Sequence, residues 1–247
     1  MIDSAALRAR LADVRARIAR AAGRSGRDPA SIRLIAVSKT FPAEYVRAAA
    51  DAGQTDFGEN KVQEALSKMD QTADLAVRWH LIGHLQSNKV KKAGRFDVVH
   101  SIDSAALVQQ LDKAAEAAGR RVDLLVQVDL AGEATKHGAR EDELKAIFDA
   151  ARSARSSRFV GLMILPPAVD DPEGARPHFR ALRDVRERLL VRGVDAAMLR
   201  ELSMGMSHDF EVAVEEGATL VRVGTAIFGD RTYSGVRLGS DPNLTPI

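Results

Sequence analysis

The sequence of 247 residues contains no cysteine and few aromatic residues, 4% of the total. The absence of cysteine excludes disulfide bonds and thiolate chemistry, and it suits a reducing compartment. No apolar run reaches the length of a membrane span. Residues 1–24 are charged throughout and lack the apolar core of a secretion signal. We therefore expect a cytoplasmic protein without a membrane partner.

The chain also lacks a strong excess of either charge. It has 36 basic and 34 acidic residues, a formal net charge of +2. This balance gives no strong case for nucleic acid or an anionic membrane as the main partner. The one basic run, KVKKAGR at 89–95, has no aromatic residues beside it on which bases could stack. We interpret it as a solvated helix face and expect no nucleic-acid binding.

Two nucleotide-binding motifs are missing as well. The first apolar run ends in SKTFP, without the G-x-G-x-x-G that a dinucleotide-binding sheet requires, and no G-x-x-x-x-G-K-[ST] occurs. Instead, short apolar runs alternate with amphipathic helical segments. The predicted strands are 32–39, 55–59, 78–83, 98–103, 123–130, 159–165, 201–204 and 219–224. The predicted helices between them are 43–52, 60–69, 86–93, 104–118, 140–154, 173–191 and 208–216.

Alternation of strands and helices indicates parallel strands with right-handed crossovers. Eight such units in a chain of this length favour a closed (β/α)8 TIM barrel, with an open doubly wound sheet as the alternative. An amphipathic helix, apolar at Leu7, Leu11, Val14 and Ile18, precedes the barrel. We predict one domain over 1–231 and a polar tail over 232–247.

Functional groups of such barrels lie at the carboxyl ends of the strands. Here these ends carry Lys39 on the first strand and Arg222 on the eighth, with many neutral hydrogen-bonding groups between them. No carboxylate pair suited to glycoside chemistry stands out. His80 lies on the third strand and His84 just after it, but no third ligand has a matching spacing, so we predict no metal site.

The loops after the seventh and eighth strands indicate a phosphate site. ELSMGMSHDFEVA places Ser203 and Ser207 before a helix, where Ser207 is a candidate N-cap, and VRVGTAIFGD places Gly224 and Thr225 after the last strand. Glycine lets backbone N–H groups approach an anion closely. In a closed barrel the first and eighth strands are neighbours, so a ligand with an aldehyde at Lys39 and a phosphate at these loops fits. Pyridoxal 5′-phosphate (PLP) has that shape.

Several long blocks resemble the YggS/PROSC family of PLP-binding, PLP homeostasis proteins. They are AVSKTFP, FGENKVQE, WHLIGHLQSNK, VVHSID, GLMILPP and ELSMGMSHDFEVAVEEGATLVRVGTAIFG. The resemblance implies a barrel related to the N-terminal domain of alanine racemase and a Schiff base on Lys39. It also implies that Arg222 faces the pyridine nitrogen. The implied contacts of the phosphate region are Ser203, Met204, Ser207, Gly224 and Thr225.

Two further residues are predicted near the cofactor. We place Asn60 near its phenolic oxygen, with capping of the next helix as the alternative. We place His84 at the wall of the pocket.

Arg222 predicts that the cofactor is a weak electron sink, because a guanidinium offers only donors and would leave the ring nitrogen unprotonated. Related racemases use a tyrosine from an additional domain as a second base, and we expect none here. The leading prediction is a monomeric carrier in intracellular vitamin B6 homeostasis, without robust catalysis, that supplies apo forms of PLP-dependent enzymes. A racemase-like PLP enzyme is the alternative, and a barrel enzyme acting on a phosphorylated sugar is a third possibility.

Overall fold

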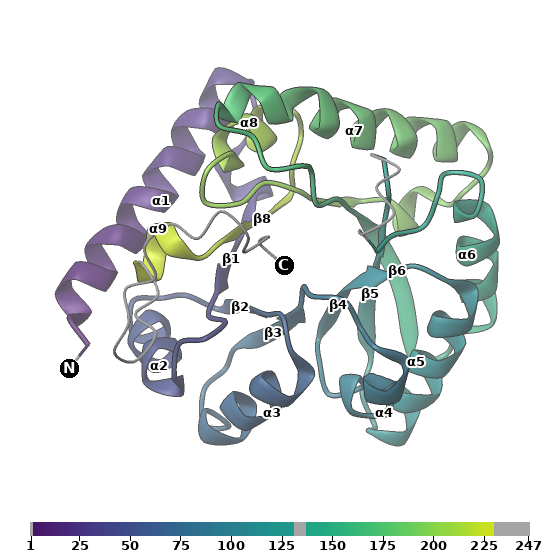
Figure 1. Ribbon diagram of the computed structural model, residues 1–247, viewed down its shortest axis with the longest axis horizontal. Coiled ribbons are helices and arrows are strands. Elements are labelled where there is room, and N and C mark those ends of the chain that lie inside the picture. The colour runs from purple at the N-terminus through teal and green to yellow at the C-terminus, as the bar shows by residue number, and fades with distance from the viewer. Residues whose placement is uncertain (1, 131–136, 230–247) are drawn as a thin grey trace.

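Eight parallel strands form a closed barrel in the computed structural model, which describes residues 2–130 and 137–229. The strands follow one another around the barrel in sequence order, and β8 pairs with β1 (Figure 1). They are β1 (Arg33–Val37), β2 (Asp56–Glu59), β3 (Arg78–Leu81), β4 (Val98–Ile102), β5 (Val122–Gln127), β6 (Ser157–Met163), β7 (Glu201–Ser203) and β8 (Leu220–Val223). The predicted (β/α)8 barrel is confirmed.

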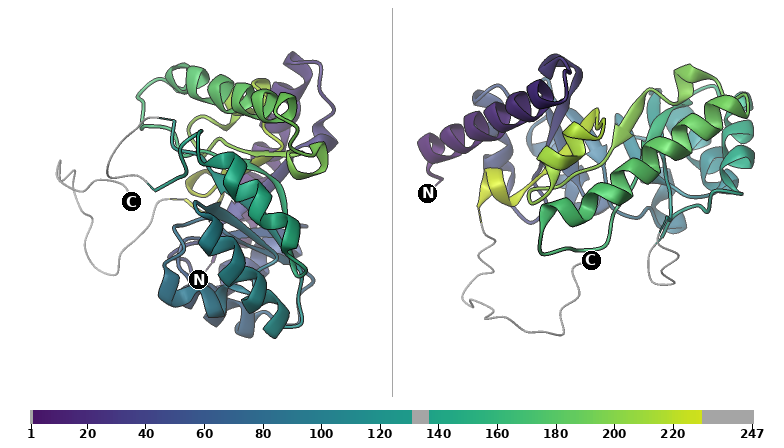
Figure 2. Two further views of the ribbon diagram at one scale, coloured as in Figure 1. Left: turned by 90° about the vertical axis from the view of Figure 1, so that its right-hand side faces the viewer. Right: turned by 90° about the horizontal axis from the view of Figure 1, so that it is seen from above.

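Helices lie outside the strands in all three views (Figure 1, Figure 2). The α-helices are α1 (Ser4–Arg24), α2 (Ala43–Asp51), α3 (Val62–Gln71), α4 (Val90–Ala93), α5 (Ala105–Ala117), α6 (Leu144–Ala150), α7 (Arg176–Val191), α8 (Phe210–Glu215) and α9 (Thr225–Phe228). Short 3₁₀ turns are η1 (Pro29–Ser31), η2 (Ser87–Lys89), η3 (Ala151–Ser153), η4 (Pro172–Ala175) and η5 (Ala196–Met198). No helix within the described ranges is long and apolar enough to cross a membrane.

The strands are buried on both faces, which explains their continuous apolar runs. One large apolar cluster fills the layer between strands and helices. A smaller cluster draws its buried members from strands alone and therefore lies inside the barrel. Its members are Ile35, Val98, Leu125, Val160, Met163 and Leu220. The barrel interior is thus packed, but part of it is left to polar side chains.

Helix α1 packs against the barrel beside α8 and α9 (Figure 1), as the apolar stripe of its sequence predicts. Leu7, Leu11 and Val14 are almost completely buried. On the outer side, Arg17 lies 2.7 Å from a carboxylate oxygen of Glu211. This helix therefore covers the seam where the barrel closes.

The observed elements differ from the predicted ones mainly at their ends. Most strands are one to three residues shorter than the apolar runs that predicted them, because pairing stops before burial does. The predicted helix 140–154 begins only at Leu144 and ends in η3. The tail 232–247 lies outside the described residues, so the proposed division at residue 231 stays a prediction.

Candidate functional site

Closure of the barrel brings the end of β1 against the end of β8. Ile35 pairs with Arg222 and Ala36 with Val223, so Val37 and Gly224 come next in the same register. A Cβ atom on Gly224 would lie 3.3 Å from the carbonyl oxygen of Val37, closer than most such contacts. Glycine at this position therefore lets the loop after β8 lie against the strand that leads to Lys39.

Lys39 is half-buried in a tight turn directly after β1. The next residue, Thr40, has φ of 70°, a conformation that is uncommon for a β-branched residue. Its amide donates a hydrogen bond of 2.5 Å to Glu64 on α3. Ser38, which precedes Lys39, donates its hydroxyl to Glu59 at 2.7 Å. Contacts on both sides thus fix the turn that carries the lysine.

A buried ammonium lies beneath this turn. Lys68 on α3 donates to the carbonyl oxygen of Ser38 at 2.8 Å, to Glu59 at 2.6 Å and to Glu64 at 2.8 Å. The second carboxylate oxygen of Glu59 makes no hydrogen bond within the described residues. Burial raises the pKa of the Glu59 carboxyl, although the Lys68 ammonium opposes this shift. The cluster connects α3 to both flanks of Lys39.

The loops after β7 and β8 meet at a hydroxyl. Ser207 accepts hydrogen bonds from the amides of Gly224, at 3.0 Å, and Ala226, at 3.5 Å. Ser207 is therefore not the N-cap that its sequence context suggested. Helix α8 begins later, at Phe210, and Asp209 occupies the N-cap position. Two backbone N–H groups converging on one oxygen are what an oxyanion such as a phosphate would require.

Gly205 shapes the first of these loops. Its φ is 92°, and a Cβ atom there would lie 2.5 Å from the side chain of Ala213. Both observations restrict this position to glycine. Its carbonyl oxygen accepts from the amide of Arg222 at 3.0 Å, which ties the loop to β8.

Arg222 points into the barrel and is 3% exposed. Its guanidinium donates to Ser203 Oγ at 2.6 Å and to the carbonyl oxygen of Ile164 at 2.8 Å. Burial lowers the pKa of Arg222 to about 10, so the group remains charged at neutral pH. A cation with two neutral acceptors is thus fixed below the loops.

Two residues predicted for the phosphate region, Ser203 and Met204, have buried side chains. The hydroxyl of Ser203 is fully buried between Arg222 and His100, 2.9 Å from His100 Nδ1, and does not face the loops. The side chain of Met204 is fully buried in the apolar layer between strands and helices. Both side chains thus have partners inside the fold, and the contact of these two residues with a phosphate stays a prediction.

Asn60 and His84 lie after β2 and β3. The backbone of Asn60 abuts Gly83 so closely that a side chain at position 83 would collide with it. Asn60 does not cap α3, because Lys61 occupies the N-cap position. The ring of His84 stacks on His137, with centroids 3.5 Å apart, and burial lowers its pKa.

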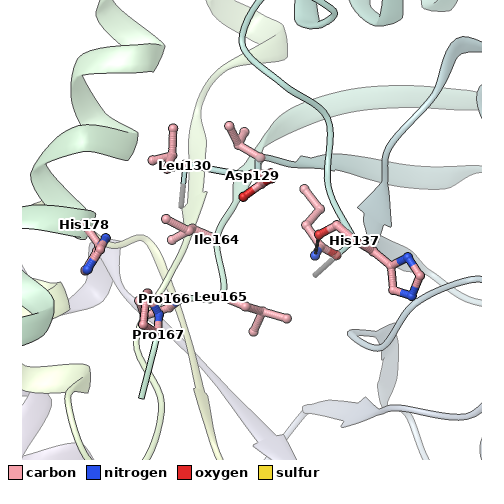
Figure 3. A pocket seen from close by; sticks show the side chains of 10 residues that line it. Asp129, Leu130, His137, Ile164, Leu165, Pro166, Pro167 and His178 are labelled. Carbon is pink, nitrogen blue, oxygen red and sulfur yellow. Dashed lines mark hydrogen bonds between the residues drawn. The ribbon is translucent and has the colours of Figure 1, made fainter. Parts of the chain in front are cut away.

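A small pocket lies beside His137, where β5 and β6 end. Figure 3 shows Asp129, Ile164 and Leu165 along its wall, with His137 and His178 on opposite sides. No group of three or more potential metal-binding side chains occurs among residues 2–130 and 137–229.

Some residues around the site escaped prediction from the sequence, among them Glu64, Lys68 and His100. One signal was available for Lys68: it lies four residues after Glu64, on a helix whose neighbouring positions are buried. His100 could have been suspected because it lies within a strand that is buried over its whole length.

Comparison with known proteins yields consistent matches along nearly the whole chain. Residues 2–232 match the family described as alanine racemase, N-terminal domain. The pyridoxal phosphate homeostasis protein of Aquifex aeolicus is 44% identical over 225 residues, which is 91% of this chain and 98% of that protein.

Solved structures also match over most of this chain. PipY of Synechococcus elongatus, whose structure has PLP bound, is 40% identical with a TM-score of 0.79, and the match covers 90% of this chain and all of that one. Alanine racemase of Corynebacterium glutamicum has a TM-score of 0.67 at 18% identity, over 97% of this chain and 65% of that one. This last match concerns the fold alone.

Proposed function

Because this chain belongs to the pyridoxal phosphate homeostasis proteins, within the alanine racemase N-terminal domain family, we propose that it binds PLP as a Schiff base on Lys39 and acts in intracellular PLP homeostasis. The observation that carries the proposal is the adjacency of the Lys39 turn and the Gly224 loop across the closed barrel. In the proposed site, the amine of Lys39 lies at one end and the converging pair of amides at the other. The solved relative with bound PLP supports the same ligand.

The residues around the site fit this cofactor. In the proposed arrangement the amides of Gly224 and Ala226, with the hydroxyls of Ser207 and Thr225, hold the phosphate. The convergence of both amides on Ser207 Oγ supports this assignment. Arg222 would face the pyridine nitrogen from inside the barrel. Asn60 and His84 remain proposed neighbours of the ring, since each lies after a strand on the same side of the barrel.

The charge of Arg222 argues for storage of the cofactor and against transamination or elimination. When bound, PLP supplies an electron sink, and the sink is strong only with a protonated ring nitrogen. A buried guanidinium offers donors and no acceptor, so it disfavours that protonation. The proposed role is therefore to hold PLP and to release it to apo forms of PLP-dependent enzymes. A cytoplasmic, monomeric protein remains the prediction from the sequence.

Reduction with borohydride tests the proposal directly. Purified protein mixed with PLP should absorb in the visible range, and borohydride should fix the chromophore to Lys39, as peptide mapping would show. Lys39→Ala should lose the fixed chromophore, whereas Lys61→Ala, which changes an exposed lysine at the start of α3, should retain it. Fixation to another lysine, or no absorbance with added PLP, would refute the assignment.

A racemase-like enzyme is the second candidate, favoured by the shared fold. Tyr45, the one tyrosine within the described residues, packs against Phe41 and Phe228 with ring centroids 5.0 and 6.3 Å away. Its ring therefore belongs to an aromatic cluster rather than to the interior of the barrel. Incubation with single L-amino acids should yield no D-enantiomer at catalytic rates. Sustained racemisation that disappears in Lys39→Ala would favour the enzyme instead.

A further inference from the structure

A continuous chain of hydrogen-bonded side chains crosses the interior of the barrel. His80 Nε2 lies 2.9 Å from a carboxylate oxygen of Asp56, and His80 Nδ1 lies 2.9 Å from His100 Nε2. His100 Nδ1 is 2.9 Å from Ser203 Oγ, which accepts from Arg222 at 2.6 Å. All five residues are at most 5% exposed. Because β5 and β6 separate β4 from β7, the link from His100 to Ser203 spans the barrel.

The two ends of this chain determine its direction. A guanidinium has only donors, so Ser203 Oγ must accept from Arg222. At the other end, Arg33 and Arg78 each lie 3.9 Å from the same oxygen of Asp56, and Thr55 donates to the other oxygen at 2.8 Å. These neighbours keep Asp56 ionised and therefore an acceptor only. The proton on the ring of His80 must accordingly lie on Nε2.

The inner links then follow one from another. A neutral His80 with its proton on Nε2 has Nδ1 as an acceptor, so His100 must donate from Nε2. A neutral His100 with that proton has Nδ1 as an acceptor, so Ser203 donates its hydroxyl proton there. Every donor in the chain thus points toward Asp56, and no hydrogen is used twice. This is the one arrangement in which both histidines are neutral.

Burial supports the neutral form of both rings. It lowers the pKa of His100 well below its ordinary value, and the nearby charge of Arg222 lowers it further. Burial also lowers the pKa of His80, although Asp56 opposes this shift. The charged groups that face these hydrogen-bonded side chains are Arg33 and Arg78, beside Asp56, and Asp209, beyond Arg222.

We propose that Asp56, His80, His100 and Ser203 are positioning residues that hold Arg222 at the ring-nitrogen side of the cofactor site. The chain directs the hydroxyl proton of Ser203 away from Arg222, so the guanidinium always meets an acceptor there. With the carbonyl oxygen of Ile164 as the second acceptor, the plane of the guanidinium is fixed. The balancing negative charge of Asp56 stays at the far end of the chain. Only the identity of the ligand that Arg222 faces rests on the proposed function.

The tautomers of the two histidines test the direction of the chain in the unaltered protein. Nitrogen-15 NMR of the labelled protein without cofactor should find His80 and His100 neutral, each with its proton on Nε2, at about pH 7. His80→Gln and His100→Gln assign the signals. A proton on Nδ1 alone, or a doubly protonated ring, would overturn the proposal. Failure to bind PLP would instead refute the proposed function and leave this result intact.

Cofactor affinity tests the effect on Arg222. His100→Leu removes the acceptor for Ser203, whereas His100→Asn offers an amide oxygen near the position of Nδ1. Val98→Ala is the packing control, because Val98 pairs in register with His80 inside the barrel. PLP affinity should fall roughly tenfold in His100→Leu and stay within about threefold in the other two. Equal losses in His100→Leu and Val98→Ala would contradict the proposal, and the NMR measurement decides it even if His100→Leu fails to fold.

Discussion

The ammonium of Lys68 lies 2.6 Å from the carboxylate of Glu59 in the layer directly below the Lys39 turn. Both side chains are nearly inaccessible, with 6% and 0% of their surfaces exposed. A lysine is rarely buried without a partner, and here it binds two carboxylates and the carbonyl oxygen of Ser38. Helix α3 therefore helps to determine the conformation of the segment that carries Lys39.

Removal of this buried cation should be strongly destabilising. Lys68→Met leaves the carboxylate of Glu59 buried and unpaired, and breaking such a pair costs about 3–5 kcal/mol. Urea denaturation should show a loss of this size. The double variant Lys68→Met/Glu59→Gln should recover most of it, because a neutral amide still accepts from Ser38. Lys92→Met, which removes an exposed cation from α4, is the matched control and should leave stability unchanged. A double variant no more stable than Lys68→Met would argue against this explanation.

Gly205 should tolerate no side chain. Gly205→Ala places a Cβ atom 2.5 Å from Ala213 Cβ and forces an L-residue to φ of 92°, which together should cost about 2–4 kcal/mol. Gly119→Ala is the matched control. It also has a positive φ, 63°, but nothing lies within 4 Å of the added atom, so it should cost only about 1 kcal/mol. Urea denaturation midpoints of the two variants measure the difference, and similar losses would exclude the predicted collision.

The fold could be predicted largely from the sequence because each buried strand has its own apolar run and each is followed by an amphipathic segment. The adjacency of Lys39 and Gly224 also followed from the sequence, since closure of any such barrel joins its first and last strands. The ends of the strands could not be predicted as well. Apolar residues continue past the last paired residue, as Ile164 does beyond β6, where burial persists in the loop.

The row of hydrogen-bonded side chains inside the barrel could not be predicted from the sequence, for a physical reason. His100 and Ser203 are 103 positions apart, and their contact depends on which face of each strand points inward and on the width of the barrel. Ser203 was consequently assigned to the loop side of its strand. Lys68 was missed because a lysine on an amphipathic helix is usually solvated. Its burial depends on two acidic groups that only the packing of α3 against β2 brings together.

Acid should destabilise the fold through the buried histidines. Burial depresses the pKa of His80 and His100 below the ordinary value of 6.5, so the unfolded chain binds these protons at a higher pH than the folded one. The free energy of unfolding therefore does not depend on these two rings well above pH 6.5. As the pH falls below 6.5 it decreases by up to about 1.4 kcal/mol per pH unit for each ring. Free energies of unfolding between about pH 7.5 and pH 5.5 should fall less steeply for His100→Asn than for the parent. His178→Asn, on α7, is the comparison variant. Parallel curves for His100→Asn and the parent would mean that His100 takes up its proton over the same pH range in the folded protein as in the unfolded chain.

The hydroxyl of Ser207 should distinguish ligands by their phosphate. It lies where the amides of Gly224 and Ala226 converge, and Ser207→Ala removes one hydrogen bond to a charged group, worth about 1.5–3 kcal/mol. PLP should therefore bind roughly ten- to a hundredfold more weakly, whereas pyridoxal, which has no phosphate, should be affected less than about threefold. Absorbance titrations with both ligands make the comparison, and Ser67→Ala, at an exposed position on α3, should alter neither affinity. Equal losses for PLP and pyridoxal would show that Ser207 orders the two loops without contacting the phosphate, because only a direct contact depends on the phosphate being present.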